Sequence, residues 1–265
     1  MRPRSALLAC LLVLCAWGVL LAQKPFKEWP GEDRVPLPPD WRDVHEWVTA
    51  RMMWHTYGGR LATGFGGWGT DYPGGDRNLI EGVRRLTLID VRSVEQAVEL
   101  DGSDDVYNWP FLYAVEVGRW GIDEEEGKQL REYLDRGGFL MVDDFHGRQQ
   151  WAVFEEGIRM AFPNEEIEDL PQTDPIFHML SDVDLKVQVA GVAALGSGRT
   201  YEQADDPFPR WRGIRDKKGR IVVAICHNMD LGDAWELSNE PNYPEEMAST
   251  AHRILVNYAT YDLTH

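Results

Sequence analysis

The sequence predicts an α/β protein built as a three-layer sandwich, with an open and mainly parallel sheet between two layers of helices. Three short runs are almost wholly apolar, as strands covered on both faces are: Phe111–Val117, Phe139–Val142 and Ile221–Ile225. Segments with helical periodicity alternate with these runs along the chain. Strands and helices in alternation imply right-handed crossovers and parallel neighbouring strands.

Four segments carry the periodicity of amphipathic helices. In chain order they are predicted from Asp76, from Asp123, over about Arg148 to Ala161, and after Pro244. Asp123 and Glu126 fit a capping box, and the pair Gly137-Gly138 supplies the stop of that helix. The apolar positions predicted to face inward in the first helix are Leu79, Val83 and Leu86.

The first 22 residues have the layout of a secretory signal. Arg2 and Arg4 precede an apolar run from Ala6 to Ala22, after which cleavage is expected. The alternative is an uncleaved anchor helix, because the run is close to the shortest length that spans a membrane. Residues 23–40 hold five prolines and predict a linker, followed by a single α/β domain over 41–265. The protein is therefore expected to be exported to the periplasm or outside the cell, and to contact a membrane only through a retained N-terminal segment.

The composition argues against nucleic acid and anionic lipid as partners and against a disulfide as a source of stability. The formal net charge is −17, and loss of Arg2 and Arg4 with the signal would leave 25 basic against 44 acidic residues, a balance of −19. Such a surface repels nucleic acid and anionic lipid, so neither is expected as a partner. Only Cys226 would remain after cleavage, so the fold must depend on its apolar core rather than on a disulfide.

Polar residues follow the run Phe139–Val142 at the point where the predicted strand ends. Asp143, Asp144 and His146 come directly after it, before the next helix. Ligands of open α/β sheets bind at the carboxyl ends of the strands. Asp144 and His146 are therefore the candidate catalytic residues, and Asp143 is a candidate ligand-binding residue. The alternative is that Asp144 or His146 only caps the following helix.

Two further segments bring polar residues to the same predicted edge. One follows the run Ile221–Ile225, and the other is the loop from Thr70 to Asp76. Their candidate ligand-binding residues are Asp71, Asp76, His227, Asn228, Asp230, Asp233 and Glu236. Asp76 is also well placed as the N-cap of the helix that it precedes. If the two strands are neighbours, the residues after Ile225 share one rim with Asp143 and Asp144.

Several ordered segments of the chain resemble one family. They include TDYPGGDRNL, YNWPFLYAVEVG, LREYLDRGGFLMVDDFHG, CHNMDLGDAWE and VNYATYDLTH. Together they resemble the bacterial family called domain of unknown function 4159. The resemblance implies a class I glutamine amidotransferase-like fold, with a flavodoxin-like sheet, and it implies no particular reaction. The family often has a histidine before the segment Pro175-Ile-Phe, where this chain has Asp174.

The sequence gives little support to a cysteine nucleophile or a phosphate site. Cys226 lacks the flanking glycines of a strained strand-to-helix elbow, and the adjacent His227 would point to the opposite face of a strand. Residues 64–69 fit a glycine-rich string, but no strand leads directly into a helix there. No cofactor is expected from the pattern. A divalent metal ion is the alternative, because carboxylates suit magnesium, calcium or manganese and an added histidine suits zinc.

Two functions fit these residues. The first is a non-enzymatic accessory domain of the cell envelope that holds a polar small molecule or an envelope component. The second is a hydrolase acting on a carbohydrate or amide through Asp144 and His146, with or without a metal ion. The missing nucleophile favours the first, and the density of ionisable groups at two strand ends favours the second. Trp68, Trp109, Trp151 and Trp235 either stack on a sugar-like ligand or pack in the core.

Overall fold

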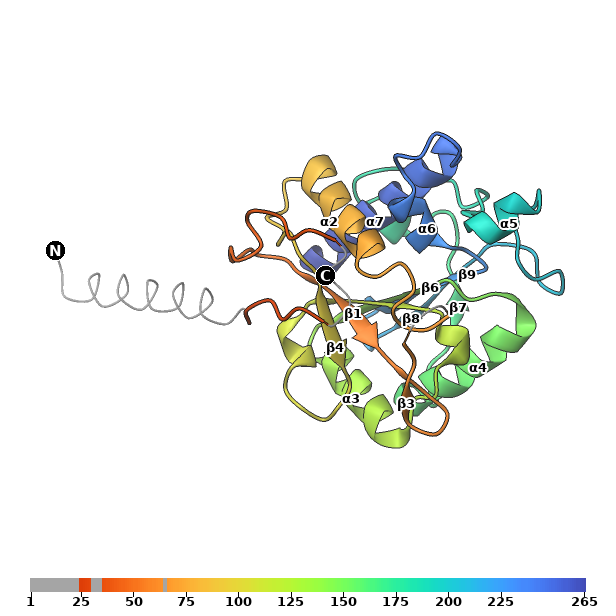
Figure 1. Cartoon of the computed structure of the whole chain (residues 1–265). Helices are drawn as coiled ribbons and strands as arrows, with labels where there is room; N and C mark the ends of the chain where they lie inside the picture. Colours follow the sequence, from red (N-terminus) through yellow and green to blue (C-terminus); the bar gives the residue numbers. More distant parts are fainter. Residues whose placement is uncertain (1–23, 30–34, 64–65) are drawn as a thin grey trace.

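A computed structural model describes residues 24–29, 35–63 and 66–265 of the chain (Figure 1). The predicted signal, the middle of the predicted linker and residues 64–65 of the glycine-rich string lie outside the described residues. Helices cover both faces of a seven-stranded sheet, which is the three-layer α/β arrangement that the sequence predicts.

The sheet has the strand order β4-β1-β5-β6-β9-β8-β7, and a separate short hairpin joins β2 and β3. The strands are β1 (Thr49–Met53), β2 (His55–Thr56), β3 (Arg60–Leu61), β4 (Gln96–Glu99), β5 (Phe111–Val115), β6 (Phe139–Asp143), β7 (Glu168–Asp169), β8 (Arg210–Arg215) and β9 (Ile221–His227). The five strands from β4 to β9 in this order are parallel, whereas β8 and β7 add an antiparallel edge. The chain reverses its direction of travel across the sheet between β1 and β5, where ligands of open α/β sheets bind.

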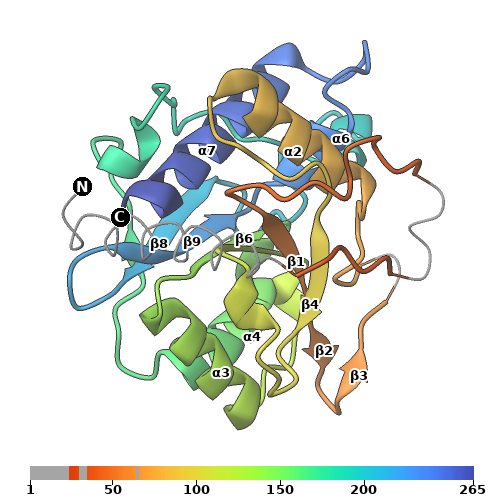
Figure 2. The same cartoon turned by 90° about the vertical axis from the view of Figure 1, so that its left-hand side faces the viewer.

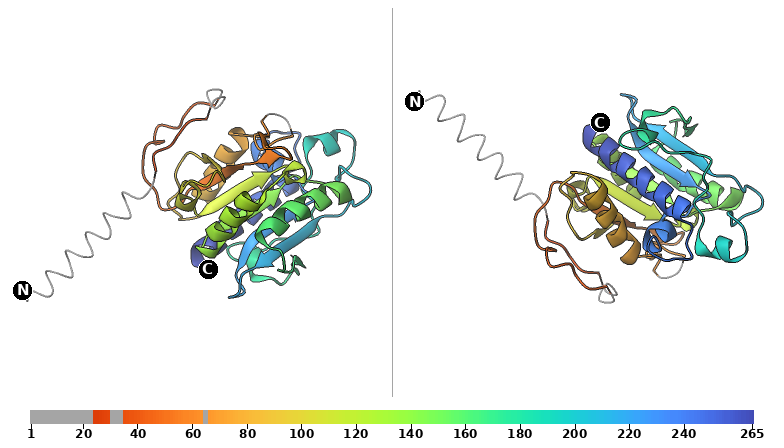
Figure 3. Two further views of the ribbon diagram at one scale, coloured as in Figure 1. Left: turned by 90° about the horizontal axis from the view of Figure 1, so that it is seen from below. Right: turned by 90° about the horizontal axis from the view of Figure 1, so that it is seen from above.

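Two layers of helices enclose the sheet. The helices are α2 (Gly74–Leu86), α3 (Glu124–Asp135), α4 (Gly147–Ala161), α5 (Val192–Gly196), α6 (Leu231–Glu236) and α7 (Glu245–Thr264), with short 3-10 turns at Val106–Asn108, Val117–Arg119 and Pro175–Phe177. Helices α2, α6 and α7 cover one face, and α3 and α4 cover the other (Figures 1 and 2). Figure 3 shows α3 and α4 in front from below, and α2 and α7 in front from above.

Alternation along the strands divides the apolar core into two halves. Phe139 and Met141 of β6 pack in the core beneath α2, α6 and α7, whereas Leu140 and Val142 pack in the core against α3 and α4. The same period of two puts Cys226 of β9 in the first half and Ile225 in the second. The side chains at the strand ends alternate between the same two faces of the sheet.

The structure confirms the four predicted helices and corrects two details of the first. The predicted capping box is present, because the Asp123 side chain accepts from the Glu126 backbone N–H and the Glu126 side chain accepts from the Asp123 backbone N–H. The prediction that Asp76 is an N-cap is wrong: α2 begins at Gly74, after Pro73. Leu86 does not face inward either, because it is the last residue of α2 and is 58% exposed.

The described parts of the predicted linker lie against the domain. The Arg77 guanidinium donates hydrogen bonds to the carbonyls of Val35 (2.7 Å) and Pro36 (3.0 Å). Arg84 forms an ion pair with Asp40 at 2.7 Å. Across the described ranges, no helix is both long enough and apolar enough to span a membrane.

Candidate functional site

The carboxyl ends of three neighbouring strands share an unusual backbone conformation. Glu116 (φ 54°) directly follows β5, Asp144 (φ 53°) follows β6, and Asn228 (φ 64°) follows β9. Asp71, in the loop before α2, has a φ of 61°. Within the described ranges these four are the non-glycine residues with positive φ. A left-handed residue with a side chain costs roughly 1–2 kcal/mol, and such residues gather at functional sites.

Asp143 ends β6 and points into the core half beneath α2, α6 and α7. Its side chain has no solvent exposure. Oδ2 accepts hydrogen bonds from the Leu231 backbone N–H (2.7 Å) and the Tyr113 hydroxyl (3.2 Å), whereas Oδ1 has no partner in the described structure. Burial, and then the neighbouring Asp144 charge, raise the pKa of Asp143 to about 8. Asp143 therefore anchors the start of α6 rather than facing solvent.

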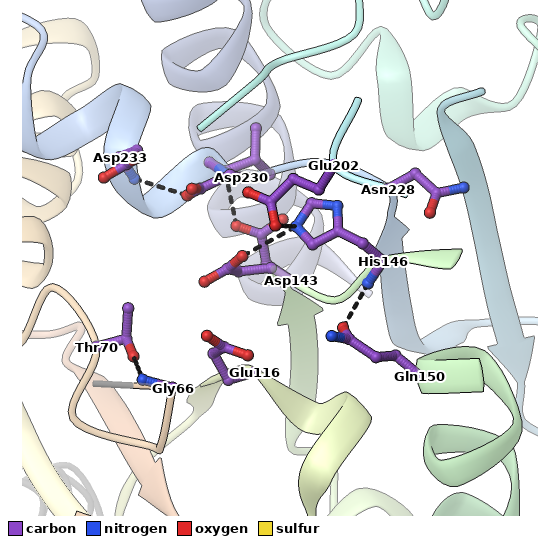
Figure 4. Close-up of polar contacts among 12 residues, drawn as sticks. Gly66, Thr70, Glu116, Asp143, His146, Gln150, Glu202, Asn228, Asp230 and Asp233 are labelled. Carbon is purple, nitrogen blue, oxygen red and sulfur yellow. Dashed lines mark hydrogen bonds and ion pairs between the residues drawn. The ribbon is translucent and has the colours of Figure 1, made fainter. Parts of the chain in front are cut away.

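Asp144 and His146 form a buried pair at the turn into α4. The Nε2 atom of His146 lies 3.0 Å from Oδ1 of Asp144. It lies 3.8 Å from Oε2 of Glu202, and Figure 4 shows the side chains of His146 and Glu202 next to each other. The Gln150 side chain fixes the turn by accepting from the His146 backbone N–H at 2.6 Å. Burial by itself lowers the pKa of His146, but the Asp144 hydrogen bond and the surrounding carboxylates raise it above its usual value. The alternative that either side chain caps α4 is not supported, since His146 occupies the N-cap position without a side-chain hydrogen bond to the helix.

Asp230 and Asp233 reach the same place from the start of α6. Asp230 is the N-cap of this helix, and its Oδ1 accepts from the Asp233 backbone N–H at 2.8 Å. Oδ2 of Asp233 accepts from the Val192 backbone N–H at 2.7 Å. Backbone contacts between the loops after β6 and β9 align the two segments, because the Asp144 N–H donates to the Met229 carbonyl at 3.1 Å.

Carboxylates from separate parts of the chain converge at this rim. Three overlapping groups of side chains have one ligand atom each within 4.8 Å of one another: Asp71 with Asp144 and Asp230, Asp144 with His146 and Glu202, and Asp71 with Asp233 and Glu236. Asp71 and Asp144 connect the three groups. We call the seven residues Asp71, Asp144, His146, Glu202, Asp230, Asp233 and Glu236 the acidic rim.

Two glycines let the backbone approach these carboxylates closely. A Cβ atom on Gly191 would lie 2.3 Å from Oδ2 of Asp230, and one on Gly232 would lie 2.5 Å from Oδ2 of Asp71. Both distances are shorter than any ordinary contact, so any larger residue at either position would displace the carboxylate that it meets. The rim is thus closely packed around its acidic groups.

Burial, and after it the crowding of like charges, raises the pKa values of the rim carboxylates. Burial, followed by the charges of Asp144 and Asp233, raises the pKa of Asp71 to about 8. Burial and the charges of Asp144, Asp233 and Asp71 raise the pKa of Asp230 well above its usual value. The described residues include no Arg or Lys in an ion pair with Asp71, Asp144, Asp230 or Asp233. His146 is the basic group that contacts the rim carboxylates directly.

Comparison with known proteins identifies the family of the chain. Residues 59–263, more than half of the sequence, match the family model described as "Domain of unknown function (DUF4159)". The chain belongs to the DUF4159 family. The search of curated proteins returned no match. The matched segment contains every residue of the acidic rim, so the site is part of the DUF4159 domain itself.

Four predicted site residues of the DUF4159 domain lie outside the rim: Asp143, which anchors the start of α6, and the residues Asp76, His227 and Asn228. Asp76 is fully buried against Arg51, with Oδ2 2.5 Å from Nη2. His227 points into the core half against α4, as the alternation along β9 requires, and its Nε2 bonds with the Gly147 carbonyl at 3.1 Å. Asn228 uses Oδ1 to accept from the Gly147 N–H and Nδ2 to donate to the Phe208 carbonyl.

Two acidic residues that interact with Asp144 or His146 are not among the sequence candidates. Glu116 follows β5 as Asp144 follows β6, and burial together with the Asp144 charge raises its pKa to about 7. The predicted strand continued through Val117, so Glu116 was assigned to the strand and not to the site. A glutamate near the end of an apolar run was the signal that could have identified it as a site residue. Glu202 comes from the loop between α5 and β8, and no local pattern marks it.

The structure also places the cysteine and the tryptophans. Cys226 has no solvent exposure, burial raises its pKa well above the usual value, and His227 points to the opposite face. Trp68, Trp109 and Trp235 are at most 2% exposed and pack in the core. Trp151 packs on Phe145 and His227, and the Arg212 guanidinium lies 4.1 Å from its ring centre. Each of these rings thus has a packing role within the domain.

Proposed function

We propose that the protein is an exported, envelope-located binding domain whose acidic rim takes up a positively charged ligand. The observation that carries this proposal is the convergence of carboxylates from four separate segments around the buried Asp144 and Asp230, without an arginine or lysine ion pair to Asp71, Asp144, Asp230 or Asp233 in the described structure. Burying unpaired carboxylates is unfavourable unless they protonate or meet a cation. A cationic ligand would remove this penalty in the folded protein.

The fold and the N-terminal sequence support the rest of the proposal. The five parallel strands, with polar residues at their carboxyl ends, agree with a class I glutamine amidotransferase-like domain that lacks its cysteine nucleophile. Cys226 is too deeply buried to attack a substrate. The basic start and apolar run of residues 1–22 support export, and the acidic surface suits an envelope component that carries positive charge.

Calorimetric titration with small cations tests this function. Suitable probes are spermidine, glucosamine and divalent metal ions, each titrated into the wild type, Asp144→Asn and Glu125→Gln. Glu125 is an exposed carboxylate in the first turn of α3, so its replacement removes one negative charge without touching the rim. We expect at least one probe to bind the wild type and Glu125→Gln but not Asp144→Asn. Equal behaviour of all three proteins would contradict the proposal.

A second candidate function is an acid–base hydrolase. Asp144 and His146 in contact at 3.0 Å, on a left-handed turn between a strand and a helix, favour it. The test is release of nitrophenol or nitroaniline from chromogenic glycosides and amides. This function requires turnover that His146→Ala abolishes without lowering the melting temperature, whereas binding without turnover supports the accessory domain.

A further inference from the structure

We propose that Asp71, Asp144 and Asp230 bind one divalent metal ion through oxygen atoms. This inference rests on the proposed function and identifies the cation. The three residues come from the loop before α2, the end of β6 and the start of α6, so the site exists only when the sheet and its loops are assembled. One carboxylate oxygen from each lies within 4.8 Å of the other two.

These separations fit a common metal centre. Hard divalent cations bind oxygen at about 2.0–2.6 Å, so two oxygens on one ion lie at most about 4–5 Å apart. Asp144 and Asp230 have only 7% and 5% of their surface exposed. A bare ion fits in such an enclosed position, whereas an organic ammonium group also needs space for the rest of its molecule. The geometry therefore favours a metal ion over an organic cation.

The carboxylates of Asp144 and Asp230 are each held by one oxygen and free at the other. Oδ1 of Asp144 lies 3.0 Å from His146 Nε2, and Oδ1 of Asp230 accepts the Asp233 N–H at 2.8 Å. No hydrogen bond from a described residue reaches Oδ2 of either side chain. Metal-binding carboxylates are commonly oriented in this way, with a hydrogen bond on the oxygen that does not bind the metal.

A third carboxylate oxygen also has no hydrogen bond, and this observation is independent of the distances within the cluster. Oδ2 of Asp71 is enclosed and has no hydrogen-bond partner in the described structure. It lies against Gly232, whose missing side chain leaves the room that the carboxylate occupies. A buried acceptor without a donor is uncommon in folded proteins, and a bound ion or water is one way to satisfy it. A metal ion between Asp71 and Asp230 would supply that partner.

The donor set indicates which ions fit. Three carboxylates and no sulfur or imidazole favour magnesium, calcium or manganese. The neighbouring group of Asp144, His146 and Glu202 contains a nitrogen ligand and would suit zinc instead. Because the two groups share Asp144, the other ligands of the bound ion show which group holds it. Oxygen ligands alone indicate the group with Asp71 and Asp230, and a nitrogen ligand indicates the group with His146.

Calorimetry with Mn²⁺, Ca²⁺ and Mg²⁺ on the chelator-treated full chain tests the metal site. We expect about one ion per chain, with binding weakened at least about tenfold in Asp230→Asn and unchanged in Glu125→Gln. Asparagine is also a good N-cap, so Asp230→Asn retains the start of α6, and circular dichroism checks that it does. Absence of metal binding in the wild type, or equal affinity in Asp230→Asn, would overturn the inference.

Two further readouts separate the possible failures. Spin-echo modulation of bound Mn²⁺ should show no directly coordinated nitrogen; an imidazole signal would move the ion to His146 and contradict the assignment. If the wild type binds spermidine but no metal, and Asp144→Asn binds neither, the metal inference fails while the cationic-ligand function stands. If the wild type binds no cation at all, both fail.

Discussion

Two acidic regions of this domain differ in whether their buried carboxylates have guanidinium partners. Beside α2, Asp76 faces Arg51 at 2.5 Å, and Glu95 faces Arg77 at 3.2 Å, so each buried carboxylate has a guanidinium partner. At the acidic rim, Asp144 and Asp230 are almost as deeply buried and have no guanidinium. Both regions lie beside the same helical layer, so burial alone does not explain the difference.

The difference in pairing indicates that the two regions have different roles. A buried ion pair holds its two elements in one arrangement, and Arg51 also donates to the carbonyls of Trp68 and Thr70. The acidic rim keeps free carboxylate oxygens, two of its aspartates (Asp71 and Asp144) lie on left-handed backbone, and both features are unfavourable for stability in the absence of a ligand. We therefore interpret the paired region as structural and the rim as the place where an external cation completes the charge balance.

The largest expected effect is on the paired region. Asp76→Asn leaves the Arg51 guanidinium buried without its counter-charge, so we expect a loss of about 3–5 kcal/mol in the free energy of unfolding. Urea denaturation of the metal-free protein measures it. Asp144→Asn is the matched change at the rim and should cause no comparable loss. A similar loss in both variants would remove the distinction between the two regions.

A smaller effect is expected from added volume at the rim. A methyl group on Gly191 meets Oδ2 of Asp230, so Gly191→Ala should weaken cation binding about tenfold, or roughly 1.4 kcal/mol. Gly196→Ala is the control, because no atom lies within 4 Å of its added methyl group. Titration calorimetry compares the two variants. Unchanged affinity in Gly191→Ala would show that the Asp230 carboxylate does not need its present position.

The smallest effect concerns a histidine–aspartate pair in solvent, as a contrast to His146 and Asp144. Hydrogen bonds that the His178 ring donates to the Asp182 carboxylate and to the Gln172 carbonyl raise the pKa of His178. The stabilisation is therefore fully present below the unfolded pKa of about 6.5 and is lost as the pH rises through the higher folded pKa. His178→Ala should lower stability slightly in acid and not at about pH 9. Salt should abolish the difference, and a salt-independent effect would contradict this account.

Most of the fold could be predicted from local patterns. The apolar runs that became β5, β6 and β9 are covered on both faces, and the capping box at Asp123 marks the start of α3. The edge of the sheet was not predicted. Strand β8 carries three arginines in Arg210–Arg215 and lacks a continuous apolar run, and its direction follows from pairing with β9 rather than from its own sequence.

The candidate site was predicted in outline and not in detail. Asp144 and His146 could be placed at the rim because they follow a central strand, whereas Asp143, which ends that strand, is buried in the core. Alternation along β9 places His227 on the other face of the sheet. Predicting this requires knowing that the strand continues to His227. Glu202 reaches His146 from a loop distant in sequence, and only the tertiary fold brings the two together.

The most direct test of the account is the stability of the wild type and Asp230→Asn, measured with and without a divalent ion. Without the ion, we expect Asp230→Asn to be the more stable protein, because burial and then the neighbouring negative charges disfavour the charged form of Asp230, and asparagine is neutral. With Mn²⁺ at about a hundred times its dissociation constant, the wild type should gain about 2.7 kcal/mol and become the more stable. An order of stability that does not change when Mn²⁺ is added would contradict the claim that the rim is built for a cation.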